Sequence, residues 1–138
     1  MSRPIVNAIV AFVPSKDFDK SKNFYLDLGC EQTWGDEGGC GLRIDGKTII
    51  LQNFYVKDHA ENFMMQLMVD DLDAWWSHID SLDLAKQFGV PSPKPPAMQP
   101  WGLRVAYVVD PSGVLWHVAQ RRENAKQDMN TRLIVSLD

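Results

Sequence analysis

The chain has 138 residues, of which 45% are hydrophobic and 23% charged, which is enough for one domain with a hydrophobic core. Its formal net charge of −4 argues against nucleic acid as a partner, and its apolar runs are too short to span a bilayer. We therefore expect a soluble, cytoplasmic protein with no membrane partner. Its two cysteines have neither zinc-site spacing nor an obvious disulfide framework, and we expect reduced thiols.

The first half of the chain predicts a strand, a helix and three more strands. Residues 5–13 are apolar and β-branched, which is typical of a strand. Apolar residues then recur at helical spacing, after a cap at Ser15 or Asp17 and before a stop at Gly29. Three short strands are predicted over about 30–35, 40–45 and 47–55. The polar segment 56–62 is predicted to be a connection.

The same order restarts in the second half. Residues 63–69 predict a strand and 70–82 a helix. The proline-rich stretch 90–100 is predicted to be an edge strand or a loop, because proline cannot donate a ladder hydrogen bond. Strands at 103–109 and 114–120 flank the sequence DPSG, which we interpret as a turn without a chemical role.

The element order predicts an α+β fold made of two βαβββ units whose mixed sheets form a cupped barrel. We assign residues 1–120 to a single domain, with repeat one at about 5–56 and repeat two at about 62–120. Residues 121–138 form a C-terminal tail whose sequence is compatible with a short helix and a strand. Packing of the tail on a second subunit and disorder are both open alternatives.

Three sequence words carry a resemblance to a known family: PSKDFDKSKNFY, VDDLDAWW, and PWGLR followed by VVDPSGVLWHVAQ. Together they resemble the bleomycin-resistance branch of the glyoxalase/bleomycin-resistance/extradiol-dioxygenase superfamily, the vicinal oxygen chelate proteins. The resemblance implies that the two units curl around a cavity. It also implies a homodimer with drug pockets at the interface between the subunits.

Metal-dependent relatives in this superfamily place His and Glu ligands at four strand positions. By resemblance, these positions fall near Val10, Ile50, Met64 and His117, and only His117 is an ordinary metal ligand. We therefore predict no metal, no cofactor and no catalytic residues, and we expect that the protein is not an enzyme of the glyoxalase or dioxygenase type.

The predicted ligand-binding residues are aromatic or polar side chains near turns and on the strand faces away from the helices. Trp101 in PWGLR is the leading candidate, because an indole stacks on flat rings and attracts cations. The full prediction comprises Trp101, Trp34, His117, Gln66, Met64 and Arg104. For Trp101 a structural role in the turn is an alternative, for His117 a hydrogen bond in a filled interior, and for Arg104 a salt bridge that fixes the loop.

Three functions are consistent with these residues. The first is sequestration of a bleomycin-like antibiotic, a small cationic and aromatic ligand, without metal or turnover. The second is a lyase, isomerase or oxidoreductase of the same fold with an atypical metal site, or with His117 as acid–base. The third is an interaction module whose cavity is filled by side chains. Of these, the resemblance favours sequestration.

Overall fold

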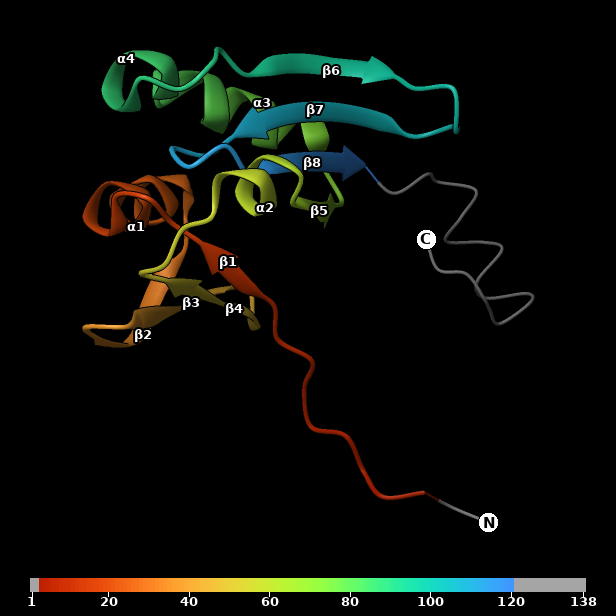
Figure 1. Ribbon diagram of the computed structural model, residues 1–138. Coiled ribbons are helices and arrows are strands. Elements are labelled where there is room, and N and C mark those ends of the chain that lie inside the picture. Colours follow the sequence, from red (N-terminus) through yellow and green to blue (C-terminus); the bar gives the residue numbers. More distant parts are fainter. Residues whose placement is uncertain (1–2, 121–138) are drawn as a thin grey trace.

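The computed structural model describes residues 3–120, which form two four-stranded sheets and four helices (Figure 1). The elements of the first half are β1 Phe12–Pro14, α1 Phe18–Leu28, β2 Glu31–Asp36, β3 Gly39–Ile44 and β4 Lys47–Gln52. After α2, Lys57–Glu61, the second half contains β5 Met64–Val69, α3 Leu72–Ser81, α4 Leu84–Phe88, β6 Lys94–Met98, β7 Arg104–Val109 and β8 Leu115–Gln120. The predicted α+β class and the repeated βαβββ order are confirmed.

Both sheets have the same mixed topology. Their strand orders are β1-β4-β3-β2 and β5-β8-β7-β6, so the first strand of each half lies beside the last. The β1–β4 and β5–β8 pairs are parallel, and the remaining pairs are antiparallel. A parallel neighbour requires a crossover, which helices α1 and α3 provide in their respective halves. The sheets are cupped but do not close into a barrel.

The first strand is much shorter than its sequence predicts. Residues 5–13 were expected to be a strand, but the ladder with β4 begins only at Phe12, opposite Ile50. Residues 3–11 form an extended arm that leaves the body of the molecule (Figure 1). β-branched composition favours extended backbone, but a strand also needs a neighbour for its hydrogen bonds. Within residues 3–120 the arm has such a neighbour only at its end, where the Ala11 carbonyl accepts from the Ile50 amide at 3.0 Å.

Three connecting segments between the predicted elements contain regular structure. The segment 56–62 contains the short helix α2, and the five-residue helix α4 was not predicted. The proline-rich stretch does form an edge strand, β6, whose register shifts between Lys94 and Ala97 where two prolines stand. The predictions for residues 121–138 lie outside the described part of the chain.

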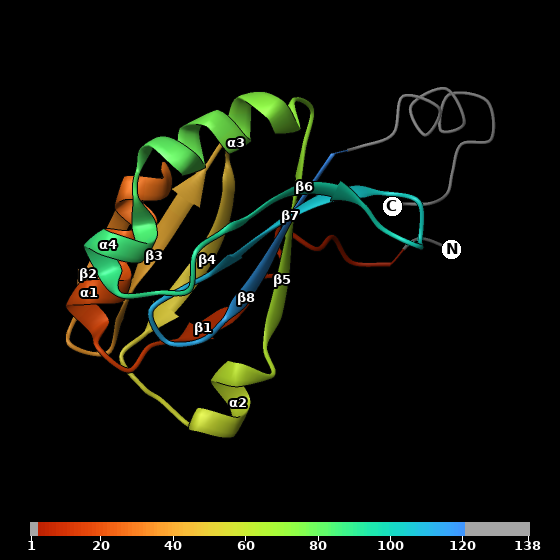
Figure 2. The same cartoon turned by 90° about the horizontal axis from the view of Figure 1, so that it is seen from above.

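The helices cover one side of the strands and bury the apolar faces of both sheets. Figure 2 shows α1, α3 and α4 gathered along one side, with β5 and the arm on the other. Helix α1 buries Phe24, Tyr25 and Leu28, and its first turn is capped by Asp17, which accepts from the Lys20 amide. No helix within residues 3–120 is long and apolar enough to cross a membrane.

A buried hydrogen-bond network joins the two halves. The Tyr25 hydroxyl in α1 donates to Asp110 Oδ2 at 2.5 Å and accepts from Trp116 Nε1 at 2.9 Å. Asp110 Oδ1 accepts from the amides of Ser112 and Val114. Burial raises the pKa of Asp110, and these hydrogen bonds oppose the rise. The DPSG turn, predicted to have no chemical role, therefore also ties repeat two to the first helix.

Candidate ligand-binding face

The second sheet presents one face that the helices leave uncovered. In the ladder, His117 on β8 pairs with Gln66 on β5 and with Tyr107 on β7, so their side chains share that face. The adjacent row pairs Trp116 with Val108, and both are buried against the helices. We call the uncovered side the open face and define it by Met64, Gln66, Trp101, Tyr107, Leu115 and His117.

Trp101 is held over the open face by the loop between β6 and β7. The Gln99 amide donates to the Leu103 carbonyl and the Gly102 amide to the Gln99 carbonyl, each at 2.9 Å. Gly102 has a φ of 92°, which permits this tight reversal. The Trp101 ring then stacks on His117, with a centroid distance of 6.3 Å and an interplanar angle of 27°.

Tyr107 forms an aromatic group with Trp101 and His117, and it is not among the binding residues predicted from the sequence. Its ring meets the His117 ring edge-on, with a centroid distance of 4.8 Å and an interplanar angle of 79°. The signal was available in the alternation of β7, where residue 107 lies opposite residue 117. Two aromatic neighbours therefore fix the imidazole plane, and Trp101 still has 51% of its surface exposed for a ligand.

The electrostatic character of the open face follows from the burial of His117. Burial lowers the pKa of the imidazole, because taking the ring out of water disfavours its charged form. At neutral pH His117 is therefore uncharged and retains one donor and one acceptor. Met64 and Leu115, which are register partners, add apolar surface, and 62% of Met64 is exposed.

Trp34 lies on the other sheet, in β2. It pairs with Gly41, which pairs in turn with Ile50, so all three belong to the face of the first sheet away from the core. A Cβ added at Gly41 would collide with Trp34 Nε1, so the indole lies directly over the glycine backbone. The contacts that fix Trp34 are thus within its own half and do not involve Trp101.

Arg104 faces away from the other predicted binding residues. Its register partner is Gln120, in the row that points toward the helices, and its Nη2 lies 2.7 Å from Asp73 Oδ1 on α3. A weaker hydrogen bond, at 3.4 Å, joins Arg104 Nη1 to Gln120. The salt-bridge alternative for Arg104 matches this geometry, and the side chain ties β7 to α3.

The positions that match metal ligands in relatives do not fit a divalent ion. Val10 lies in the arm, and Ile50 and Met64 offer a hydrocarbon and a thioether rather than nitrogen or oxygen donors. His117 is the single ordinary ligand of the four. Across the described range 3–120, no three His, Cys, Asp or Glu side chains come close enough together to hold a metal ion.

The chain is similar to known bleomycin resistance and bleomycin-binding proteins. The bleomycin resistance protein of Klebsiella pneumoniae is 29% identical over 113 residues, covering 78% of this chain and 87% of that protein. The crystal structure of a bleomycin-binding protein complexed with bleomycin is 27% identical with a TM-score of 0.73, covering 85% of this chain and 100% of that one. Lactoylglutathione lyase from Agrobacterium tumefaciens shares the fold alone. It is 17% identical with a TM-score of 0.62, covering 85% of this chain and 95% of that one.

The family model of the "Glyoxalase/Bleomycin resistance protein/Dioxygenase superfamily" matches residues 6–118, which is both sheets except the last two residues of β8. The resemblance carried by the three sequence words is thereby confirmed. The chain belongs to the glyoxalase/bleomycin resistance protein/dioxygenase superfamily.

Proposed function

We propose that this protein binds a bleomycin-like antibiotic on the open face and sequesters it without converting it. The observation that carries the proposal is the stacked pair of Trp101 and His117, which offers a half-exposed indole backed by an ordered ring. A flat aromatic surface of this kind suits the heteroaromatic part of a ligand, and an indole face also attracts a cation. The similarity to bleomycin-binding and bleomycin resistance proteins supports the same function.

The donor chemistry of the open face supports binding over turnover. A hydrolytic or isomerising reaction assisted by a metal requires several nitrogen or oxygen ligands around an open position, and His117 alone meets this description. The neutral imidazole can instead donate or accept one hydrogen bond to a ligand, as can the neighbouring Gln66 amide. The net charge of −4 favours a cationic ligand over an anionic one.

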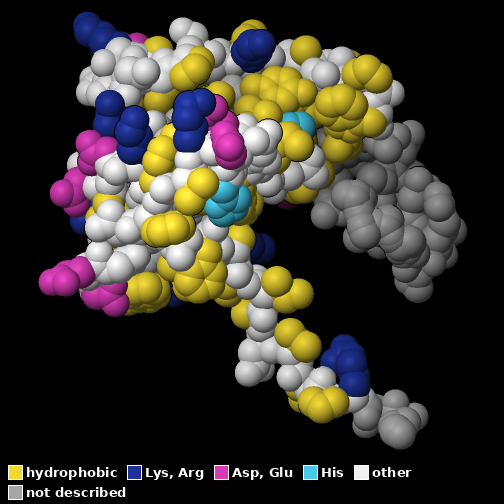
Figure 3. Space-filling model, in the orientation of Figure 1, with side chains coloured by type: hydrophobic (Ala, Val, Ile, Leu, Met, Phe, Trp, Pro, Cys, Tyr) yellow, Lys and Arg dark blue, Asp and Glu magenta, His cyan; other side chains and the backbone are white. Residues whose placement is uncertain are grey.

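We further propose that the protein acts as a homodimer in the cytosol. The arm carries Ile5 and Ile9, which are 86% and 94% exposed, and Phe12 follows it with about half its surface exposed. Figure 3 shows hydrophobic side chains along this arm and over the β6–β7 end of the molecule. Such an apolar segment is expected to be covered in solution, and a second copy is the proposed cover. The free thiols of Cys30 and Cys40 support a reducing compartment.

The test of drug binding is a titration of the full chain with metal-free bleomycin in the presence of EDTA, in which isothermal calorimetry measures the heat of binding. We expect saturable binding of one or two drugs per dimer, unchanged when EDTA is omitted. Trp101→Ala is expected to weaken binding at least about fivefold, since an aromatic contact contributes roughly 1 kcal/mol beyond burial.

Met98→Ala is the matched control, because Met98 is an exposed apolar residue of β6 whose register partner Arg104 lies away from the open face. No heat of binding at millimolar drug would rule out bleomycin as the ligand. A Met98→Ala loss as large as the Trp101→Ala loss would refute the open face as its site. Turnover of a substrate abolished by His117→Ala would favour an enzyme instead.

A further inference from the structure

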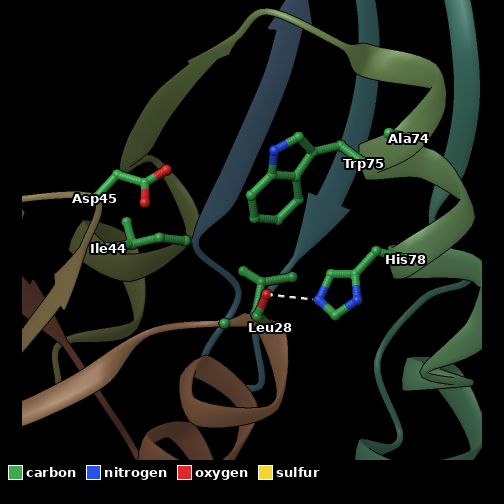
Figure 4. Close-up of a pocket in the computed structure, with 7 residues that line it drawn as sticks. Leu28, Ile44, Asp45, Ala74, Trp75 and His78 are labelled. Carbon is green, nitrogen blue, oxygen red and sulfur yellow. Dashed lines mark hydrogen bonds between the residues drawn. The ribbon is translucent and has the colours of Figure 1, made fainter.

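A cleft lies on the helix side of the molecule, and none of its lining residues belongs to the open face. It is a cleft of about 320 Å³ between the end of α1, the β3–β4 turn and α3 (Figure 4). Its lining comprises Leu28, Gly29, Ile44, Asp45, Ala74, Trp75 and His78. We call it the rear cleft. The first half of the chain supplies one wall and α3 of the second half supplies the other, so the cleft exists only because the two repeats pack together.

The walls of the rear cleft are apolar and lie around a glycine. Figure 4 shows the Trp75 indole projecting from α3 into the space that faces Ile44. A Cβ added at Gly29 would lie 3.6 Å from Ile44 Cδ1 and 3.9 Å from Trp75 Cη2, so the bare glycine backbone keeps the floor open. The cleft can therefore receive a small apolar group against an aromatic ring. Its volume is at the lower end of the range of about 300–1,000 Å³ that is usual for ligand pockets.

The polar groups of the rear cleft favour positive charge. Asp45 stands at the rim and makes no hydrogen bond or ion pair through its carboxylate with any residue in the range 3–120. The C-terminal end of the eleven-residue helix α1 also faces the cleft, and helix C-termini carry partial negative charge. Together with the negative face of the Trp75 ring, these groups select for a cation.

The backbone turn that carries Asp45 and the ring of His78 are held in place by contacts within the protein. Asp45 has a φ of 46° and Gly46 a φ of 78°, which is the tight two-residue turn that Asp-Gly favours between antiparallel strands. His78 Nε2 lies 2.8 Å from the Leu28 carbonyl oxygen, which can only accept, so Nε2 carries a proton. This bond fixes the His78 ring beside Trp75, at a centroid distance of 5.6 Å.

We propose that the rear cleft is a second ligand site, which binds a small organic ammonium ion with an apolar body. The apolar body lies against Trp75 and Ile44, and the ammonium group faces the Asp45 carboxylate. The ligand would contact both repeats, so it would also stabilise their packing. The site shares no residue with the open face and stands independently of the proposed antibiotic binding.

The probe is 2-phenylethylammonium, titrated into ¹⁵N-labelled full chain and followed by ¹H–¹⁵N correlation spectra. We expect saturable shifts of the Trp75 indole N–H and the Gly29 amide, with no shift of the Trp101 indole N–H. Asp45→Asn keeps the turn, because asparagine tolerates positive φ, and is expected to weaken binding about fivefold. Added salt should weaken binding in the same direction.

Three comparisons decide the proposal. Asp80→Asn removes an equal charge from α3 outside the cleft lining and should leave the affinity unchanged. Ala74→Phe should block the cleft while the exposed position preserves folding. The neutral isostere 2-phenylethanol and the anion 3-phenylpropionate should bind more weakly than the cation. Equal binding of all three probes, an unaltered Asp45→Asn affinity, or shifts confined to Trp101 would overturn the second site without affecting the test of bleomycin binding.

Discussion

The hydroxyl of Tyr25 gives the sharpest test of how the two repeats are held together. Tyr25 is completely buried, and its single oxygen both donates to Asp110 and accepts from Trp116. Tyr25→Phe removes that oxygen while keeping the ring, which packs edge-on against Phe24 and Trp116. The substitution therefore isolates the two hydrogen bonds from the packing of the core.

The expected loss of stability follows from the two groups that lose a hydrogen-bond partner, the Asp110 carboxylate and the Trp116 indole N–H. A hydrogen bond to a charged group contributes roughly 1.5–3 kcal/mol and an unsatisfied buried donor costs roughly 1–3 kcal/mol, so with partial relaxation we expect a loss of about 3 kcal/mol. For an m value of about 1.5 kcal/mol per molar urea, the unfolding midpoint falls by roughly 2 M. Tyr55→Phe is the control, because no hydrogen bond of its hydroxyl is found in the range 3–120.

The pH dependence of this loss tests its cause. Burial already raises the pKa of Asp110 above its ordinary value, and the Tyr25 hydroxyl opposes that rise by favouring the ionised carboxylate. Ionisation of Asp110 costs stability as pH rises through its folded pKa, and without the hydroxyl this cost is larger. The deficit of Tyr25→Phe should therefore grow as the pH rises above about 4, the ordinary pKa of an aspartate. A deficit below about 1 kcal/mol, or one independent of pH, would refute the assignment of the network.

Two further predictions concern the faces that point away from the helices. Gly41→Ala places a Cβ against Trp34. We therefore expect the NMR resonance of the Trp34 indole to move and the free energy of unfolding to fall by about 1–2 kcal/mol. An unmoved resonance would contradict the close approach of the indole to Gly41. Burial holds the pKa of His117 below its ordinary value, so the ring is neutral above about pH 6.5 and gains charge only in more acidic solution. Affinity for a cationic drug, measured by calorimetry, should be constant from about pH 8 to 6.5 and fall below it, and His117→Gln should remove the acid limb.

Local sequence patterns determined the order of the elements and several of their ends. Asp17 caps α1, and Gly29, with a φ of 132°, ends it as its position predicted. The Asp45-Gly46 pair forms the turn between β3 and β4. These features depend on a few neighbouring residues, which is why they can be predicted without knowing the rest of the fold.

Strand alternation also predicted which side chains share a face. Met64 and Gln66 alternate with Met65 along β5 and so share a face, His117 points to the face opposite its neighbour Trp116, and the register agrees with both arrangements. The same alternation groups Arg104 with the residues that face the helices, which its place in PWGLR obscured. Alternation predicts to which face of its own strand a side chain points. It does not predict which residues a loop contacts when it folds back over the sheet.

Only the tertiary structure decided which segments meet. Residues 5–13 have the composition of a strand, yet a strand requires a partner, and only Phe12–Pro14 lie beside β4. Trp101 meets His117 because a loop reverses over the sheet, and Trp75 and Asp45 share a cleft because two repeats pack together. Sequence determined the local geometry through short-range sterics and hydrogen bonds, whereas the open face and the rear cleft arise from contacts between residues far apart in the chain.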